Sequence, residues 1–155
     1  MIIIELINMP TLIQNFFENK INNTDTFFKL MGIVAFLAVT IDFMWIQLVM
    51  KDQYNKMIPD IQNDSMIVRI LPTLLAYVTI ILSILLFALP RISRESRIKD
   101  SLLYGGFLGV LMYGMFSFTN YAIISKWNMK VVLLDVMWGF ILYSVVSYLS
   151  SLFMV

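Results

Sequence analysis

Two aspartates lie inside apolar stretches of the chain, and each is followed one helical turn later by a tryptophan: Asp42 by Trp45, and Asp135 by Trp138. A carboxylate in the hydrocarbon of a membrane is costly, so it usually marks an ion path, a substrate site or an obligatory polar contact. Two carboxylates brought close together titrate as a pair, which suits a proton relay. The spacing therefore predicts an intramembrane site that handles protons, cations or amines.

Polar residues late in the third apolar stretch are the natural companions of these aspartates. With about 1.5 Å of helical rise per residue from the nearest loop lysine, Asp135 lies about 7–8 Å deep, Asn120 about 9 Å and Asp42 about 13 Å. Their helices run in alternating directions, so we expect one shared polar pocket in which Asn120 orients the carboxylates. Thr119 and Ser117 are further candidates for this pocket.

The same residues also admit a structural interpretation. Each carboxylate could hydrogen-bond Asn120, Thr119 or an indole N–H and so fix the helix register, as a polar clasp. Trp45 and Trp138 are more typical of interfacial anchors or packing than of a substrate cage. We favour a binding or transport role for the aspartates because carboxylates inside membranes are rare and usually functional.

Composition limits the chemistry that the chain can perform. Of its 155 residues 60% are hydrophobic and 14% charged, which indicates one small membrane domain. Eleven basic against 10 acidic residues give no reason to expect nucleic acid as a partner. The chain has no Cys and no His, so we predict no disulfide, no metal site of the usual ligands and no cofactor.

Four apolar runs are long enough to cross a hydrocarbon core of about 30 Å. They are residues 27–50, 67–89, 102–125 and 131–155, and the connections between them carry nearly all the charge. We therefore expect an all-α integral membrane four-helix bundle over residues 27–155. Residues 1–26 form a separate segment, for which an interfacial amphipathic helix and a frayed lead-in are equally good descriptions. The apolar face of that helix would carry Leu12, Ile13, Phe16 and Phe17.

Glycines predict where the third and fourth helices pack. Gly105 and Gly109 have the G-x-x-x-G spacing that permits close backbone approach. At about 100° per residue, Asn120 points within about 20° of Gly109, so the packed face also carries the amide. In the fourth helix, Gly139 shares its side with Asp135.

A stripe of small residues follows the fourth helix on another side. Ser144, Ser147 and Ser151 lie well away from the side of Asp135. Small-residue stripes let membrane helices approach one another. We therefore expect this stripe to form a second protein contact, which suits a homo-oligomer.

The basic residues predict how the chain is oriented in the membrane. Six of them lie at the end of the bundle that carries the termini, and five lie at the other end. Four of the six are in the short loop 91–99. Short loops dominate the positive-inside rule, so we expect both termini to be cytosolic. Binding of anionic lipid is a second role that this loop could have.

The pattern as a whole resembles the domain of unknown function 2177 family, predicted four-helix membrane proteins, over roughly residues 33–146. The resemblance rests on I-D-F-M-W-I-Q-L-V, Tyr54, S-F-T-N-Y-A, Trp127 and L-D-V-M-W-G. Matching positions are Asp42, Trp45, Thr119, Asn120, Ala122, Trp127, Asp135, Trp138 and Gly139. Gln47 stands where the family implies glycine, and Phe116 and Ser117 where it implies tyrosine and aspartate. A mechanism that needs that third carboxylate is in doubt for this chain.

The resemblance implies a fold but no established activity. From the residues we expect small-solute, proton or cation transport, or small-ligand binding, at the Asp/Asn/Trp site. A structural or assembly protein of a cellular or viral membrane is the alternative. The Ile, Asn and Lys usage is typical of an AT-rich genome, such as that of a large DNA virus or a low-GC bacterium. A membrane-embedded lipid-modifying enzyme is the weakest option, because no nucleophile or phosphate-binding loop accompanies the aspartates.

Overall fold

The computed structural model describes residues 11, 14, 15, 18 and 24–154. Over these residues the chain is helical without strands, and four of its helices are long and apolar enough to cross a membrane. The predicted all-α, four-helix fold is thus confirmed. The expected amphipathic face of the N-terminal segment lies outside the described residues.

The first helix is much longer than the sequence suggested. It comprises α3 (Thr24–Trp45), a π-helical turn (Ile46–Met50) and α4 (Lys51–Gln62), which follow one another without a break. We expected the helix to stop at residue 50 and a loop to follow. That expectation was wrong, because the charged segment continues the helix beyond the length that a membrane requires.

Packing against the fourth helix accounts for α4. Apolar residues recur along it at helical spacing and contact the start of the fourth helix. The cluster contains Met50, Tyr54, Met57, Ile58 and Ile61 on one side and Trp127, Val131 and Val132 on the other. The helix ends at Asn63, whose backbone is left-handed (φ 55°) and whose N–H donates to the carbonyl of Pro59 at 2.8 Å.

The other three spans follow with short connections. The second is α5 (Ile70–Ser83), extended by a π-helical turn (Ile84–Ala88) and a 3₁₀ turn (Leu89–Arg91). The third is α6 (Arg97–Asp100), a π-helical turn (Ser101–Gly106) and α7 (Phe107–Ile123). The fourth is α8 (Met129–Ser151), whose first turn is capped by the side chain of Asn128, which accepts from the Lys130 N–H at 2.8 Å.

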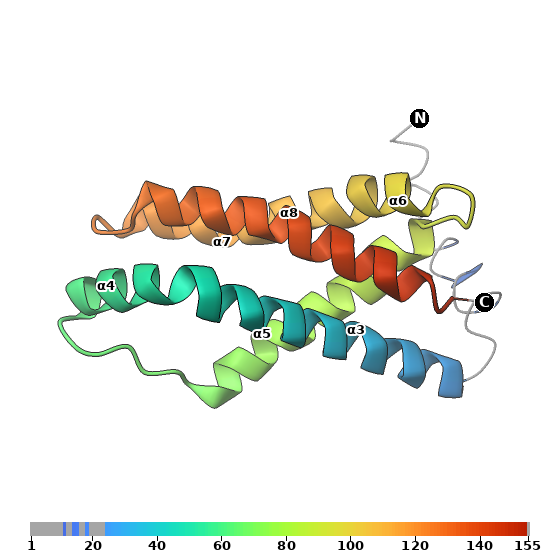
Figure 1. Ribbon diagram of the computed structural model, residues 1–155, viewed down its shortest axis with the longest axis horizontal. Coiled ribbons are helices and arrows are strands. Elements are labelled where there is room, and N and C mark those ends of the chain that lie inside the picture. Colours follow the sequence, from blue (N-terminus) through green and yellow to red (C-terminus); the bar gives the residue numbers. More distant parts are fainter. Residues whose placement is uncertain (1–10, 12–13, 16–17, 19–23, 155) are drawn as a thin grey trace.

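Three of the spans run side by side and one crosses them. Helices α7 and α8 form an antiparallel pair, α3 and α4 lie along α8, and α5 crosses obliquely and diverges from α4 (Figure 1). The core joins residues of α3, α8 and the end of the second span. Its buried members include Leu30, Val34, Ala38, Leu85, Leu89, Leu142 and Val146.

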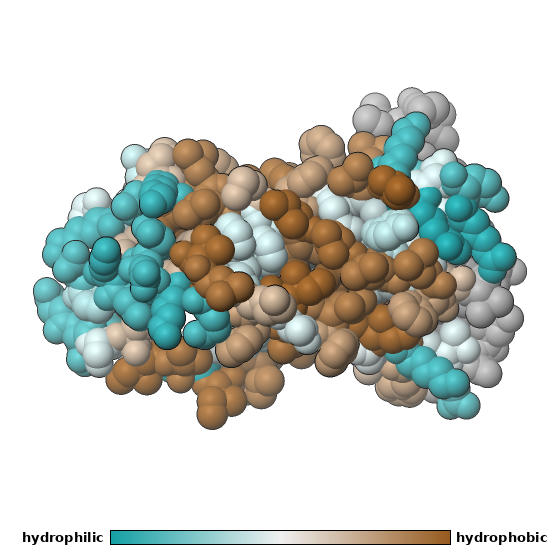
Figure 2. Space-filling model, viewed as in Figure 1, coloured by the Kyte–Doolittle hydropathy of each residue, from teal (hydrophilic) through white to brown (hydrophobic). Residues whose placement is uncertain are grey.

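The outer surface carries a broad apolar band. Figure 2 shows this band across the middle of the molecule, between two hydrophilic ends. Large side chains in it are open to the surroundings: Phe36 is 70% exposed, Leu111 68% and Met115 72%. Soluble monomers rarely expose apolar patches of this extent. The surface therefore fits the hydrocarbon of a bilayer.

Candidate functional site

Asp42 accepts hydrogen bonds from all three other spans. The indole Nε1 of Trp138 donates to its Oδ1 at 2.8 Å, and the hydroxyl of Tyr113 donates to the same oxygen at 3.3 Å. The hydroxyl of Tyr77 donates to Oδ2 at 2.9 Å. An ionised carboxylate has about four lone-pair positions, so three donors leave one position, on Oδ2, open. Asp42 thus links α3 to α5, α7 and α8.

Asp135 has a network of its own near the start of α8. Its Oδ1 accepts from the hydroxyl of Tyr54 at 3.0 Å and its Oδ2 from the hydroxyl of Ser117 at 2.5 Å. The Asp135 side chain is buried, at 4% exposure, and Ser117 is fully buried. The donors come from α4 and α7, so this carboxylate ties α8 to both. Ser117 stands where the family pattern implies an aspartate, and here it supplies a donor.

Two stacked tryptophans lie beside the Asp42 network. The rings of Trp45 and Trp138 stack in parallel, with centroids 4.4 Å apart and an interplanar angle of 1°. Trp138 lies one turn after Asp135 in α8 and donates to Asp42. The two aspartates therefore lie in separate hydrogen-bond networks, and the indole of Trp138 belongs to that of Asp42.

The π-helical turn explains how one helix serves both networks. Between Asp42 and Tyr54, an unbroken α-helix would turn the side chains about 120° apart. The one extra residue in a π-helical turn reduces this angle to about 20°. The turn between them (Ile46–Met50) therefore lets Asp42 and Tyr54 face the same side of the bundle. Met50 at the end of that turn is likewise buried.

A cavity of about 510 Å³ adjoins Asp42 between α3, α5 and α7. Its described lining carries one charged residue, Asp42 itself. The hydroxyl-bearing lining residues are Tyr54, Thr73, Tyr77, Thr79, Tyr113 and Tyr143, and the others are apolar. Ala76 and Phe116, on facing helices, are exposed members of its lining. The volume is in the range of small-molecule sites, about 300–1,000 Å³.

Tyr143 extends the hydrogen bonding beyond the cavity. Its hydroxyl and that of Ser83 share a hydrogen bond of 2.8 Å, and Ser83 also donates to the carbonyl of Ile80. The rings of Tyr113 and Tyr143 meet edge to face, with centroids 6.3 Å apart. The wall of the cavity is thus held by contacts among α5, α7 and α8.

Thr119 and Asn120 do not join either network. Thr119 is exposed and Asn120 half-buried, and the hydrogen bonds of the described residues connect the carboxylates to other groups. The described hydrogen bonds therefore give Asn120 no part in orienting the aspartates, and its role in the site stays a prediction. The antiparallel register that pairs Ser117 with Asp135 carries Asn120 one turn further toward the connecting loop, past the carboxylate.

The glycines lie at the contact between α7 and α8. A Cβ on Gly139 would be 2.6 Å from the carbonyl oxygen of Gly109, and a Cβ on Gly109 would overlap the backbone of Gly139. A Cβ on Gly105 would be 2.7 Å from the hydroxyl oxygen of Ser147. Close approach of the two backbones at these positions requires glycine.

The serine stripe of α8 faces the interior of the same chain. Ser147 and Ser151 are fully buried, and Ser144 is 6% exposed. They pack beside the third span, where the hypothetical Cβ of Gly106 would meet Ser144. The burial of Ser147 and Ser151 fits their predicted role in helix packing, but this packing is within one chain. The homo-oligomer stays a prediction, and it would need another face.

Tyrosines are the site residues that the sequence interpretation missed. Tyr77, Tyr113 and Tyr143 were not singled out, although a hydroxyl within a membrane span needs a partner. Tyr113 follows Gly109 by one helical turn, which was a usable signal. The described residues include no group of three Asp, Glu, His or Cys that could hold a metal ion. The polar chemistry of the site is that of two carboxylates with hydroxyl and indole donors.

Four membrane-length helices with buried intramembrane carboxylates define a multi-pass integral membrane protein. Residues 27–152 match the model of a family described as a predicted membrane protein, domain of unknown function 2177, and the chain belongs to that family. Comparison with curated proteins and with solved structures finds no match.

Proposed function

We propose that the protein binds a small cationic solute, a protonated amine or a monovalent cation, in the cavity beside Asp42, as a step in moving it across the membrane. The observation that carries the proposal is the lining of this cavity, which combines one carboxylate with four tyrosines and no basic residue among its described members. A lone negative charge in an apolar setting attracts a cation more strongly than it would in water.

The open position on Oδ2 of Asp42 is where the cation would bind. Oδ1 already accepts from Trp138 and Tyr113, whereas Oδ2 accepts only from Tyr77. A cation at the open position would share Oδ2 with the Tyr77 hydroxyl, so of the three hydrogen bonds it would weaken chiefly that one. The aromatic faces of the cavity add cation–π attraction, which strengthens when the site is dry.

Competition with Tyr77 suggests how binding is coupled to movement. Tyr77 lies in α5, most of whose large apolar side chains are exposed, among them Leu71, Leu74 and Val78. Apart from its packing on α3, this helix has few side chains in the core. Loss of the hydrogen bond to Asp42 would free α5 to shift, and a cation could then enter or leave between α5 and α7. A transported proton would use the same carboxylate.

Binding can be measured on the purified protein in detergent. Trp45 and Trp138 adjoin Asp42, so methylammonium or Na⁺ should change tryptophan fluorescence and raise the thermal midpoint in a saturable manner. Asp42→Asn, which is nearly isosteric, should abolish both effects. Asp135→Asn should keep them, because Asp135 does not line the cavity. Equal responses of the wild type and Asp42→Asn would contradict the proposal.

A structural role is the second candidate, and the donors of Asp42 favour it. Each of the three other spans donates to this one carboxylate, as a clasp that holds a bundle together would require. If the clasp is its whole purpose, the wild type binds no cation and Asp42→Asn loses folded protein. The two proposals therefore differ in a measurable response of the wild type.

We also infer that both ends of the membrane domain are cytosolic. The start of α3, the loop before α6 and the end of α8 lie at one end of the molecule (Figure 1). Arg94 lies in that loop and Arg91 and Arg97 flank it, and short basic loops stay on the cytosolic side. A reporter fused after Val155 should be active in the cytosol. Activity on the other side would overturn the orientation.

A further inference from the structure

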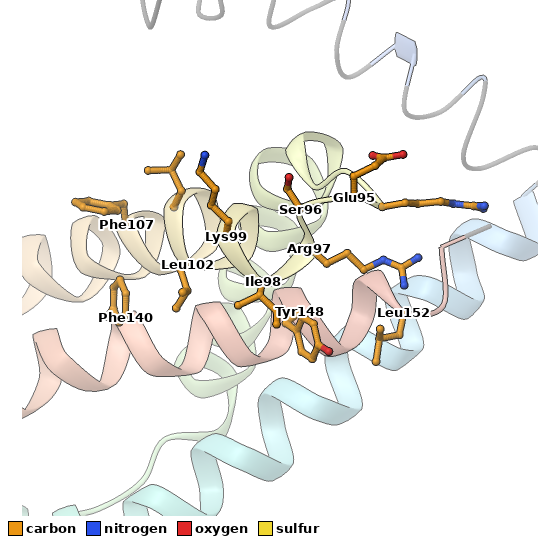
Figure 3. Close-up of a pocket in the computed structure, with 12 residues that line it drawn as sticks. Glu95, Ser96, Arg97, Ile98, Lys99, Leu102, Phe107, Phe140, Tyr148 and Leu152 are labelled. Atoms are coloured by element: carbon orange, nitrogen blue, oxygen red, sulfur yellow. The ribbon is translucent and has the colours of Figure 1, made fainter.

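A second cavity, of about 820 Å³, lies at the basic end of the molecule, away from Asp42. It is a groove between the start of the third span and the second half of α8 (Figure 3). Arg94, Arg97 and Lys99 line it, with Glu95 as the one acidic member of the lining. Three basic residues against one acidic residue leave an excess of two positive charges in the lining of this groove.

These basic side chains are available to a ligand. Arg94 and Lys99 are exposed and Arg97 is half-buried, and among the described residues no ion pair joins any of them to an acid. The nearby carboxylate of Asp100 accepts through Oδ2 from the backbone N–H and the hydroxyl of Ser93, at 2.9 and 2.8 Å, and not from a basic residue of the groove. The three basic side chains are therefore not paired with an acid within the described part of the chain.

The rest of the groove is apolar and extends toward the middle of the membrane. Its apolar lining residues are Ile98, Leu102, Leu103, Phe107, Phe140 and Leu152. Figure 3 shows Phe107 and Phe140 at one end and Glu95, Ser96 and Arg97 at the other. From Arg97 to Phe107 the helical rise is about 15 Å, which is half of a hydrocarbon core. The groove thus runs from the membrane surface to about its midplane.

We propose that this groove binds an anionic phospholipid of the surrounding leaflet, with its head group attracted by the positive charge of Arg94, Arg97 and Lys99 and an acyl chain along Leu103, Phe107 and Phe140. A lipid supplies both parts at once, a negative head group at the surface and a hydrocarbon chain below it. A soluble phosphate compound would leave the apolar half of the groove unfilled. A zwitterionic lipid would leave the excess positive charge uncompensated.

The test compares lipid binding by the full-length protein and two charge variants. Titration with phosphatidylglycerol in detergent should give saturable binding that phosphatidylcholine does not reproduce. Changing Arg94, Arg97 and Lys99 to Gln together should weaken that binding about 100-fold, at about fivefold per residue. The control changes Lys51, Lys56 and Lys130, at the opposite end, to Gln and removes the same charge. Its binding should equal that of the wild type.

A substitution that fills the apolar part of the groove distinguishes a specific lipid-binding site from general attraction of anionic lipid to a basic surface. Leu103→Trp leaves every charge in place but occupies the apolar part, so it should weaken phosphatidylglycerol binding at least tenfold. Three outcomes would overturn the proposal: equal weakening by the two charge variants, no effect of Leu103→Trp, or full competition by inorganic phosphate. The last of these would identify a soluble phosphate compound as the ligand. A thermal midpoint measured without lipid verifies that each variant is folded.

Discussion

Trp138 donates its indole N–H to Asp42 at 2.8 Å and stacks its ring on Trp45. One side chain of α8 thus hydrogen-bonds to a buried carboxylate of α3 and packs against a tryptophan of the same helix. Burying a carboxylate in hydrocarbon is costly unless hydrogen-bond donors compensate for the lost water. The hydrogen bond from the indole is the shortest of the three that Asp42 accepts. The first and fourth spans therefore depend on each other at this point.

Trp138→Phe should destabilise the protein. It removes a hydrogen bond to a charged group, worth about 1.5–3 kcal/mol, as well as part of the stacked surface. Trp127→Phe is the matched control, because Trp127 is equally buried at 8% exposure and its Nε1 has no hydrogen-bond partner. Thermal unfolding in detergent should show the larger drop in midpoint for Trp138→Phe. Similar drops for the two variants would contradict the importance of this hydrogen bond.

Ser117→Ala should lower stability by about 1–2 kcal/mol, because Asp135 would lose the donor to its Oδ2 inside a buried contact. Thr119→Ala removes a hydroxyl of the same helix that is exposed and does not bind either carboxylate. Equilibrium unfolding in mixed micelles should therefore separate the two variants. If Thr119→Ala proved the more damaging, the assignment of Ser117 as the partner of Asp135 would fail.

Gly139→Ala should disrupt the contact between α7 and α8. Its new Cβ would lie 2.6 Å from the backbone oxygen of Gly109, which cannot move away as a side chain could. Overpacking of this kind costs about 1–3 kcal/mol. Gly32→Ala adds the same methyl group where nothing lies within 4 Å and should leave the thermal midpoint unchanged or higher. Equal midpoints for the two variants would rule out the close approach.

Deleting Leu48 should be tolerated better than deleting Phe36. Both side chains are exposed, at 77% and 70%, so neither deletion removes core packing directly. Leu48 lies in the π-helical turn, where loss of one residue restores an α-helix and keeps Asp42 and Tyr54 on one side. Loss of Phe36 from α3 would turn its two halves about 100° relative to each other. The yield of monodisperse folded protein measures the difference, and equal yields would contradict this interpretation of the turn.

Hydrophobicity and charge were sufficient to predict the four spans, because the bilayer fixes the length of an apolar helix. The continuation of the first helix through α4 was missed. Its polar composition is typical of a loop. In the structure, Met57 and Ile61 pack against the start of α8, and this packing accounts for the helix. Contacts of this kind join distant parts of the chain, and a single sequence does not reveal them.

The aspartates were predicted from sequence, whereas their partners were not. A charged residue within a long apolar run can be recognised from the sequence alone, so Asp42 and Asp135 were identified directly. Tyr77 and Tyr113 look like ordinary aromatic residues until a helix crossing brings their hydroxyls to Asp42. Asn120 was chosen from its estimated depth and its angle around the helix, whereas the structure pairs Asp135 with Ser117, about one turn earlier in the same helix.

The central claim, that a cation binds at Asp42 and moves across the membrane, is tested most directly by flux into liposomes that contain the purified protein. Proton, Na⁺ and methylammonium uptake should be compared for the wild type, Asp42→Asn and Asp135→Asn at equal amounts of folded protein. We predict that uptake of at least one cation is saturable in the wild type and falls at least tenfold in Asp42→Asn, while Asp135→Asn keeps a measurable part. Uptake by folded Asp42→Asn at the wild-type rate, or no uptake of any cation above that of empty liposomes by the wild type, would contradict it.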